Sequence, residues 1–369
     1  MRLTYITSGT FPSSKASSIQ VMQMCAAFAE AGAMVKLVGR PSESTADVFA
    51  YYGVAPTFTF TTPSWWNIPR AADVFQARSV FAERGSDWVC YTRGRDLTAP
   101  MFALLRGARA LVEAHGRPLT VREKLMLTWI ARHPRGRLIV ISEPLQEIYR
   151  REFNLESLVA PDGVDLKRFE PRLSKEEVRT HLGLEKATWI VYTGGLYEGR
   201  GLETLFTGVA ALPAQLLIVG GRDADEIAVW RKKAKILGAD NVYFVGYQTP
   251  ARVPLYLFAA DILAMPYSAR TLTPSGEETT QWMSPLKLYE YLAAGRPIVA
   301  SDLPALRYVL THNENALLAT ADDEHMLRTS YERLLRDESL RERLAANARA
   351  TAEANTWLAR AKKILECVS

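Results

Sequence analysis

Residues 284–302 read SPLKLYEYLAAGRPIVASD, and this stretch decides the fold. Its first half predicts a helix over Pro285–Ala294 that ends at Gly295, because proline is favoured in a first helical turn and glycine just beyond a last one. Its second half, PIVA at residues 297–300, is a short apolar run typical of a buried strand. A helix, a glycine stop and a buried strand in succession indicate an alternating α/β fold.

The same alternation of helices and strands extends from this stretch along the chain. Short runs of β-branched and aromatic residues predict strands, and amphipathic stretches that end at glycine predict helices. Two such series occur, and each is typical of a parallel sheet with right-handed crossovers. We expect strands at residues 2–8, 35–38, 88–92, 110–113, 138–142, 188–193, 215–219, 242–245, 261–265 and 297–300, and helices at 18–31, 143–153, 202–211, 285–294 and 324–365.

A turn-rich segment, APDGVDLKRFEP at residues 160–171, separates the two series and marks a domain boundary. We expect one domain over residues 1–165 and another over 166–354. The predicted fold class is therefore α/β, with two Rossmann-like, doubly wound domains that face a cleft. Open α/β sheets bind ligands at the carboxyl ends of their strands, so two facing sheets would bring two bound molecules together for a group transfer.

Composition excludes several classes of protein. The 369 residues are 48% hydrophobic and 23% charged, which is ordinary for a globular chain and excludes a disordered or collagen-like one. Three dispersed cysteines, Cys25, Cys90 and Cys367, predict neither a disulfide framework nor a zinc site. The sequence shows no signal peptide and no apolar run of the ~18 residues that span a bilayer, so we expect a cytoplasmic protein, soluble or attached to the membrane from one side.

Positive charge is concentrated in residues 101–137. Eight basic and two acidic residues there give a local net charge of +6, against +5 for the whole chain. Such a patch can bind an anionic membrane, a phosphate-bearing substrate or nucleic acid, and the alternative is a solvated helical face. Trp65 and Trp66 are further candidates for membrane binding. The basic residues are Arg106, Arg109, Arg117, Arg122, Lys124, Arg132, Arg135 and Arg137.

Lys287 and Glu290 stand three residues apart near the start of the 285–294 helix, so they share one helix face. Amides at a helix N-terminus attract phosphate. Ser284 directly precedes this helix, and Lys287 in its first turn adds the positive charge of its ammonium group. A carboxylate further along the helix, at Glu290, suits the hydroxyls of a ribose. The pair fits a nucleoside diphosphate, and the alternative is an exposed ion pair worth ~0.3 kcal/mol.

The whole chain resembles the GT-B-fold retaining glycosyltransferases of family 4 (glycosyltransferase group 1). The block that begins at Ser284 is similar to that family's most diagnostic segment, in which a Glu, seven residues and a second Glu precede Ala-x-Gly-x-Pro. Glu290 matches the second Glu, whereas Trp282 stands in place of the first. The resemblance implies that Glu290 binds ribose. Glu277 or Glu278 would have to replace the missing carboxylate in recognition of the donor sugar.

A second block, YTGGLYEGRGLETLF at residues 192–206, resembles the family's glycine-rich turn from a strand into a helix. Gly194 and Gly195 allow close approach of a backbone to a ligand. Arg200 stands where the family has its phosphate-binding lysine. The resemblance implies that Arg200 and Lys287 hold the diphosphate and supply the positive charge that a metal ion supplies in GT-A glycosyltransferases.

The same resemblance assigns further positions. Gly246 and Tyr247, in VYFVGYQ, are implied to meet the nucleobase. Lys15 and Ala16 fall where the family has two glycines in a loop on the acceptor side. The C-terminal segment, residues 355–369, is similar to the family's final helix and is expected to pack back on the first domain.

His115 is the catalytic candidate in the first domain, together with Arg200 and Lys287 in the second. It follows the strand expected at residues 110–113, and the family's histidine at this place lies beside the reacting sugar, where its side chain or backbone carbonyl assists the developing charge. Glu113, two residues earlier, is expected to point away from it, because side chains alternate along a strand.

The resemblance implies a retaining, hexosyltransferase-type glycosyltransferase. It would move a sugar from a nucleotide-diphosphate sugar, UDP- or GDP-linked, to a hydroxyl of a glycan, a lipid-linked or a small-molecule acceptor in cell-envelope polysaccharide, lipopolysaccharide or glycolipid synthesis. We expect no metal or other cofactor, because Asp223-Ala-Asp225 alone is a weak metal signal. We expect residues 101–137 to bind the anionic inner face of the membrane, and we expect no nucleic acid as a partner. The alternatives are a sugar-nucleotide epimerase or hydrolase of the same fold, and a catalytically silent protein that binds nucleotide sugar or membrane.

Overall fold

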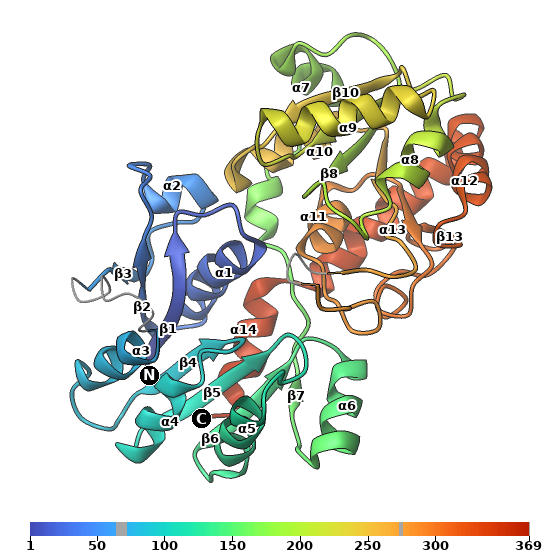
Figure 1. The fold of residues 1–369 in the computed structure, drawn as a ribbon. Coiled ribbons are helices and arrows are strands. Elements are labelled where there is room, and N and C mark those ends of the chain that lie inside the picture. Colours follow the sequence, from blue (N-terminus) through green and yellow to red (C-terminus); the bar gives the residue numbers. More distant parts are fainter. Residues whose placement is uncertain (64–71, 273–275, 369) are drawn as a thin grey trace. The chain divides into compact units, whose positions relative to one another are not determined.

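Two parallel sheets organise the chain, each within its own compact unit (Figure 1). The computed structural model describes residues 1–63, 72–272 and 276–368. One unit comprises Met1–Asp162 and Trp357–Ser369, and the other comprises Gly163–Thr356.

The boundaries of the units differ by two or three residues from those expected at 165/166 and 354/355. The reason is local pairing where the chain enters and leaves the second unit. The Val164 amide donates to the Asn355 carbonyl at 3.1 Å, and Val164 forms a parallel β-bridge with Thr356. These contacts pair the segment where the chain enters the second unit with the segment where it leaves, so both segments belong to that unit.

The sheet of the first unit has the strand order β3-β2-β1-β4-β5-β6-β7, with parallel neighbours throughout the described residues. The strand order reverses between β1 and β4, which makes the carboxyl ends of these strands the topological switch point. The strands are β1 (Arg2–Phe11), β2 (Met34–Pro41), β3 (Thr59–Thr61), β4 (Val89–Arg93), β5 (Arg109–Ala114), β6 (Gly136–Val140) and β7 (Leu158–Val159).

The helices of the first unit pack against one another in two groups. α14 packs against α1, whereas α4 contacts both α3 and α5. Right-handed crossovers on either side of the switch point place these groups on opposite faces of the sheet. The helices are α1 (Ala16–Glu30), α2 (Val48–Tyr52), α3 (Ala72–Phe81), α4 (Thr98–Leu105), α5 (Val121–Arg132), α6 (Glu143–Phe153) and α14 (Trp357–Glu366).

The sheet of the second unit has the order β10-β9-β8-β11-β12-β13, again with parallel neighbours in the described chain. This is the order of the Rossmann fold, and its switch point lies between β8 and β11. The strands are β8 (Trp189–Thr193), β9 (Gln215–Val219), β10 (Val242–Gly246), β11 (Ile262–Met265), β12 (Ile298–Ser301) and β13 (Leu317–Ala319).

The helices of the second unit cover both faces of its sheet. They are η2 (Leu166–Phe169), α7 (Lys175–Leu182), α8 (Leu202–Val209), α9 (Ala224–Ile236), η3 (Pro250–Arg252), α10 (Val253–Ala259), α11 (Leu286–Ala294), α12 (Glu324–Arg336) and α13 (Glu338–Ala354).

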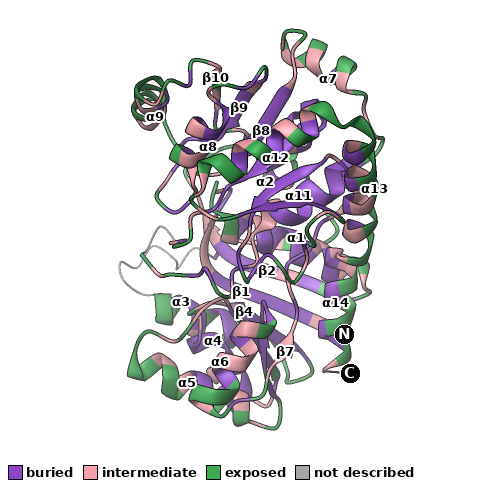
Figure 2. Ribbon diagram, turned by 90° about the vertical axis from the view of Figure 1, so that its right-hand side faces the viewer, coloured by how far each residue is buried: buried purple, intermediate pink, exposed green. Residues whose placement is uncertain are grey.

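Burial on both faces explains why the strands have nearly continuous apolar sequences. In β8, Trp189 and Val191 belong to one core cluster of the second unit, and Ile190 and Tyr192 belong to the other. Figure 2 shows most strands as buried, and it shows α12 and α13 buried on one side but α11 buried on nearly all sides. The two-residue period of a strand therefore supplies a core to each layer of helices.

Most expected elements are present, within a few residues of the expected ends. α6 begins at Glu143, where the sequence predicted it, and the hydroxyl of the preceding Ser142 accepts a hydrogen bond from the Leu145 amide. Trp65 and Trp66 lie outside the described residues. Within the described ranges, no helix is both long and apolar enough to cross a bilayer.

Candidate functional site

The residues that the sequence singled out in the second unit converge on the switch point of its sheet. β8 leads into Gly194 and the loop that carries Arg200, and β11 leads into Tyr267. Gly201 allows these two strand ends to meet: its φ is +65°, and a Cβ there would lie 1.4 Å from the Pro266 carbonyl oxygen. Only glycine fits that approach, so the turn after β8 packs directly on the end of β11.

Lys287 lies in the first turn of α11 and points to this switch point. Its Nζ atom is 3.9 Å from the ring centroid of Tyr192 and 5.3 Å from that of Tyr267, distances that allow cation–π attraction. Gly194 makes room for it, because a Cβ at Gly194 would lie 2.8 Å from Lys287 Nζ. The lysine is thus enclosed by aromatic rings and glycine backbone.

Arg200 lies near the ring of Tyr267 as well. Its guanidinium carbon is 4.9 Å from the ring centroid of Tyr267 and 4.4 Å from that of Tyr197. Burial and the nearby Arg200 charge hold the pKa of Lys287 well below its ordinary value, although Glu290 opposes them. Two cations beside one buried carboxylate leave the cluster short of negative charge, so an anion such as a diphosphate would stabilise it.

Glu290 lies on α11 beyond Lys287, and its charge is balanced by a residue that sequence reasoning missed. Arg168 Nη1 is 3.3 Å from Glu290 Oε1, and both side chains are largely buried. Burial raises the pKa of the Glu290 carboxyl, while Arg168 and Lys287 oppose that shift. Arg168 also donates to the Pro250 carbonyl. It lies in the turn-rich segment at residues 160–171, which the sequence indicated only as a domain boundary.

Tyrosines fix the helix that carries these groups. The Tyr291 hydroxyl accepts a hydrogen bond from the Thr193 amide at 2.8 Å, which ties α11 to the end of β8. The hydroxyls of Ser284 and Tyr289 are 3.3 Å apart at the start of the helix. The contacts of Tyr192 and Tyr267 with the cations, and the bond of Tyr291 to Thr193, had no signal in the sequence.

The expected nucleobase segment ends on the same edge of the sheet. Gly246, with φ at +86°, forms a bridge with Gly220 at the end of β9, and a Cβ at Gly220 would lie 1.9 Å from the Gly194 carbonyl oxygen. Three successive strand ends are therefore joined by glycines. Tyr247 follows Gly246 and is 40% exposed, so its ring is accessible to a ligand.

The position that lacks the family's first glutamate is occupied by a half-buried Trp282. Of the two candidate replacements, Glu278 is paired with Arg270 at 3.3 Å between Oε2 and Nε. Asp223, the first residue of the D-x-D sequence, caps α9, because its side chain accepts a hydrogen bond from the Glu226 amide at 2.8 Å.

In the first unit, His115 lies just past the end of β5, and the expectation for Glu113 was wrong. Glu113 and His115 do not point apart: Glu113 Oε1 contacts His115 Nε2. The strand ends at Ala114 and the chain bends, so side-chain alternation no longer applies at His115. Arg93 Nη2 lies 3.0 Å from the other ring nitrogen, Nδ1.

These contacts define the protonation state of His115. Burial and the charge of Arg93 lower its pKa to about 4, although Glu113 opposes them, so the ring is neutral at pH 7. Arginine only donates, so Nδ1 accepts from Arg93 and the single ring proton is on Nε2, directed at Glu113. Both ring nitrogens are engaged within the protein.

Lys15 and Ala16 are exposed at the start of α1, after β1. They lie at the carboxyl edge of the parallel sheet, and His115 follows β5 at the same edge. The structure thus places the expected acceptor-side residues and the histidine at one edge of the first unit.

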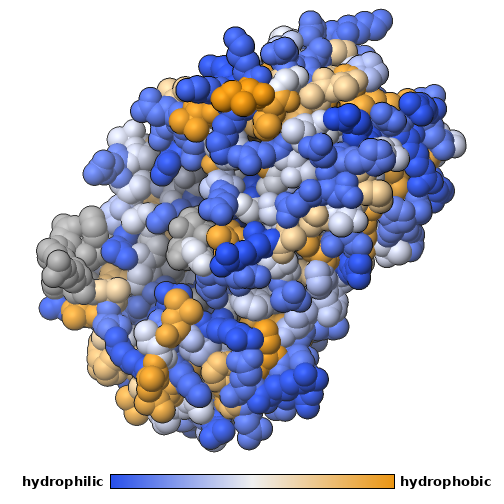
Figure 3. Space-filling view, turned by 45° about the vertical axis from the view of Figure 1, so that its right-hand side comes forward, coloured by the Kyte–Doolittle hydropathy of each residue, from blue (hydrophilic) through white to orange (hydrophobic). Residues whose placement is uncertain are grey.

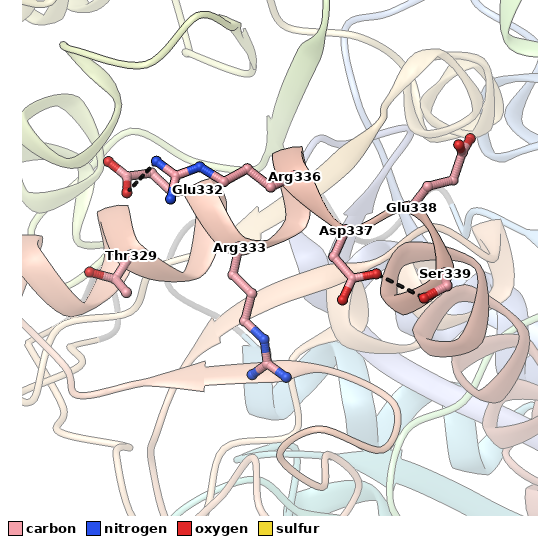
Figure 4. Close-up of a pocket in the computed structure, with 7 residues that line it drawn as sticks. All are labelled: Thr329, Glu332, Arg333, Arg336, Asp337, Glu338 and Ser339. Atoms are coloured by element: carbon pink, nitrogen blue, oxygen red, sulfur yellow. Dashed lines mark hydrogen bonds and ion pairs between the residues drawn. The ribbon is translucent and has the colours of Figure 1, made fainter.

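A surface pocket lies elsewhere in the second unit, at the junction of α12 and α13 (Figure 4). Its cations are already engaged, since Arg333 donates to Asn313 and Arg336 pairs with Glu332. It is lined by Thr329, Glu332, Arg333, Arg336, Asp337, Glu338 and Ser339. None of the expected site residues lines it.

Comparison with known proteins finds similarity to one family over the second unit and part of the first. Residues 187–337 match the model of the glycosyl transferases group 1. The D-inositol 3-phosphate glycosyltransferase of Jonesia denitrificans is 28% identical over 228 residues, which cover 58% of this chain and 51% of that protein. The lipopolysaccharide core biosynthesis mannosyltransferase LpsB of Rhizobium meliloti is 31% identical over 175 residues, covering 44% and 45%. The chain thus spans about half the length of the curated relatives it matches.

Solved structures share the whole fold at low sequence identity. Sucrose-phosphate synthase from Thermosynechococcus elongatus aligns with a TM-score of 0.74 at 21% identity, covering 99% of this chain and 98% of that one. Alr3699/HepE of Anabaena, in complex with UDP-glucose, aligns with a TM-score of 0.75 at 16% identity, covering 100% and 99%. The two sheets therefore have the GT-B glycosyltransferase fold. Residues 187–337 thus match the family that the motifs resemble, the group 1 glycosyltransferases.

Proposed function

We propose that the chain is a retaining glycosyltransferase that moves a sugar from a nucleotide-diphosphate sugar to an acceptor hydroxyl. The observation that carries the proposal is the cluster of Arg200 and Lys287 around Tyr267 at a Rossmann switch point, with Glu290 beyond Lys287 on α11. Cations at that place match a diphosphate, and a carboxylate beyond them matches a ribose.

Each residue then has a defined role. Arg200 and Lys287 bind the diphosphate and stabilise the charge that develops on it as the bond to the sugar breaks, without a metal ion. Glu290, held by Arg168, accepts hydrogen bonds from the ribose hydroxyls. Gly194, Gly195 and Ser284 border the diphosphate, and Gly246 and Tyr247 meet the base. The UDP and UDP-glucose complexes of Alr3699/HepE support a UDP-sugar as the donor, with a GDP-sugar as the alternative.

The first unit would hold the acceptor near His115, Lys15 and Ala16. Because both ring nitrogens of His115 are bonded within the protein, its imidazole is not a proton carrier. It would instead assist through its fixed, neutral ring or its backbone carbonyl, next to the reacting sugar. Retention of configuration follows from the family resemblance.

An envelope lipid or glycan on the cytoplasmic face of the membrane is the proposed acceptor class. The names of two relatives refer to such acceptors: a lipopolysaccharide core mannosyltransferase and a phosphatidyl-myo-inositol mannosyltransferase. The surface of α5 supports the same proposal. Val121, Leu125 and Trp129 recur every four residues on it and are 74%, 65% and 39% exposed. Exposed basic residues of the 101–137 segment flank this apolar stripe.

Such a stripe fits an anionic membrane better than charge alone would. Apolar side chains enter the interface while neighbouring arginines and lysines meet lipid phosphates. Figure 3 shows apolar and hydrophilic side chains interleaved on the surface of the first unit. Acidic partners partly neutralise the positive charge of two of the basic residues, because Arg117 pairs with Glu152 and Arg122 pairs with Asp73.

The test is a binding and transfer screen. Wild-type protein, Lys287→Ala and Arg200→Ala are measured against UDP-, GDP-, ADP- and TDP-sugars by thermal shift and calorimetry. Each variant should bind the preferred donor about ten- to a hundredfold more weakly, the cost of one charged hydrogen bond. Lys233→Ala is the matched control: this lysine also lies over an aromatic ring of the second unit, 4.5 Å from Trp230.

Two results would contradict the proposal. If Lys287→Ala bound the donor as tightly as the Lys233→Ala control, Lys287 would not be part of a diphosphate site. Release of free sugar or an epimer, with no product that depends on an acceptor, would identify a hydrolase or epimerase instead.

A further inference from the structure

A buried carboxylate in the first unit collects partners from separate parts of the chain. Glu113 on β5 is fully buried. It accepts hydrogen bonds from Gln20 on α1, at 2.8 Å, and from the Tyr91 hydroxyl on β4. His115 contacts its Oε1 atom. Arg360, on α14, places Nη2 2.9 Å from its Oε2 atom.

Arg360 is the cation that balances this charge. It is itself buried, at 5% exposure, and its charge and its contact with His115 hold the pKa of Glu113 far below its ordinary range against the effect of burial. A buried carboxylate without such a partner would take up a proton rather than stay ionised.

The same guanidinium also holds the chain just before the second unit begins. Arg360 Nε donates to the carbonyls of Ala160 and Pro161, at 3.1 and 2.8 Å. Arg360 therefore has two separable functions: a positive charge next to Glu113, and hydrogen bonds that fix the segment at residues 160–161.

The ionised state of Glu113 matters to His115. Arg93 occupies Nδ1 as a donor, so the ring proton must be on Nε2 and must meet an acceptor. An ionised Glu113 carboxylate accepts the hydrogen bond from His115 Nε2. A protonated Glu113 carboxyl has a proton of its own to donate and therefore competes with the ring proton for this contact. Ring orientation and tautomer thus depend on the charge of Glu113.

We propose that Arg360 is a positioning residue that acts on His115 through Glu113, by keeping this carboxylate ionised. The inference rests on the proposed function only in placing His115 beside the reacting sugar. The other titratable or charged groups that face the cluster are Tyr5 on β1, Tyr91 and Arg93 on β4, and Asp162.

The test separates charge from hydrogen bonding with two substitutions. Arg360→Gln removes the charge but keeps donors for the carbonyls of residues 160 and 161, and Arg360→Lys keeps the charge but has no planar fork. The ring of His115 is followed by NMR across a pH titration, and its signal among the five histidines is assigned with His115→Gln.

In Arg360→Gln, Glu113 should take up a proton and cease to favour the charged ring, so the midpoint of His115 should fall by about one pH unit or more, whereas a rise would show that Arg360 acts on the ring directly. In Arg360→Lys it should stay near the wild-type value, even if the protein is less stable. Arg106→Gln is the matched control, because Arg106 also binds two carbonyls of the first unit, those of Val80 and Glu83. It should leave the His115 midpoint unchanged.

An unchanged His115 midpoint in Arg360→Gln, or a shift in Arg360→Lys alone, would overturn the inference. A second readout is the pH profile of sugar transfer at saturating donor, whose acidic limb should move with the His115 midpoint in Arg360→Gln while the KM for donor stays constant. If the wild-type protein shows no transfer, the proposed function fails, and the NMR titration still decides the role of Arg360.

Discussion

Lys287 has surroundings that differ strongly from water. It is enclosed by Tyr192, Tyr267 and Gly194 and lies near a second cation, Arg200, so its protonated form is disfavoured in the empty site. A bound diphosphate reverses this balance, because a nearby anion favours the ammonium. Ligand binding and protonation of Lys287 are therefore linked.

This linkage predicts proton uptake when UDP binds. The pKa of Lys287 rises on binding, so UDP affinity should fall as pH increases through the interval between the free and bound pKa values. Calorimetry in two buffers of different ionisation enthalpy would measure the protons taken up. Lys287→Met should abolish the uptake and Lys233→Met should not, whereas equal enthalpies in both buffers for the wild type would refute the linkage.

Asp162 makes a second prediction at the scale of a residue. Burial raises its pKa to about 7, with Glu113 adding to the shift and Arg360 opposing it. The folded state thus binds a proton that the unfolded state releases near pH 4, so stability falls as pH rises from about 4 to 7. The loss is at most about 4 kcal/mol.

Asp162→Asn should remove this slope. The variant should be more stable than wild type at pH 8 and differ little at pH 4, as measured by urea unfolding at several pH values. Asp87→Asn, at an exposed position, serves as the control. A wild-type stability that is flat over this interval would contradict the buried, proton-bearing Asp162.

The sequence predicted part of the candidate site at this scale, and the reason is local. Gly194, Arg200, Lys287 and Glu290 lie in short motifs whose spacing is set by one turn or one helix, and the structure brings them together. Their partners come from distant parts of the chain: Arg168 lies 122 residues from Glu290. An arginine in a linker looks exposed until the packing of η2 against α11 is known.

At the scale of elements, α5 combines features that are separate in the sequence. The count of charged residues indicated a basic patch at residues 101–137. The apolar stripe of Val121, Leu125 and Trp129 can be recognised only once the structure shows that this face of the helix is exposed. Its other face buries Leu127 and Ile130 against the first unit. The helix is therefore anchored on one side and open on the other.

Replacing this stripe should weaken membrane binding. Leu125→Gln with Trp129→Gln should reduce partition to vesicles that contain anionic lipid roughly tenfold or more, because burial of two large apolar side chains is lost. Flotation measures the bound fraction. Val229→Gln with Ile236→Gln on α9 is the matched control, since these residues are 56% and 72% exposed. Equal binding of wild type to neutral and anionic vesicles would contradict the proposal.

Strands of four or more residues were predictable, and shorter strands were not. β8 has five β-branched or aromatic residues in a row, and β9 has four aliphatic residues after Gln215, which is a strong signal. β3 and β13 have three residues each and β7 has two, too few for any periodicity. They form because a neighbouring strand offers hydrogen bonds, which is a property of the sheet.

At the scale of the whole molecule, two units with separate cores should unfold separately. Differential scanning calorimetry should show two transitions. UDP at a hundred times its dissociation constant should stabilise the unit that binds it by about 2.7 kcal/mol and raise only one transition. Arg360→Gln should lower the other. A ligand that raises both transitions equally would show that the units do not unfold independently.

The return of α14 to the first unit has a consequence for biosynthesis. A ribosome makes Glu113 early and Arg360 only after the entire second unit. Until then the nascent first unit lacks the cation that neutralises its innermost carboxylate. Its completion is thus deferred until the second unit has been synthesised, and a chain terminated before α14 would leave Glu113 without its cation.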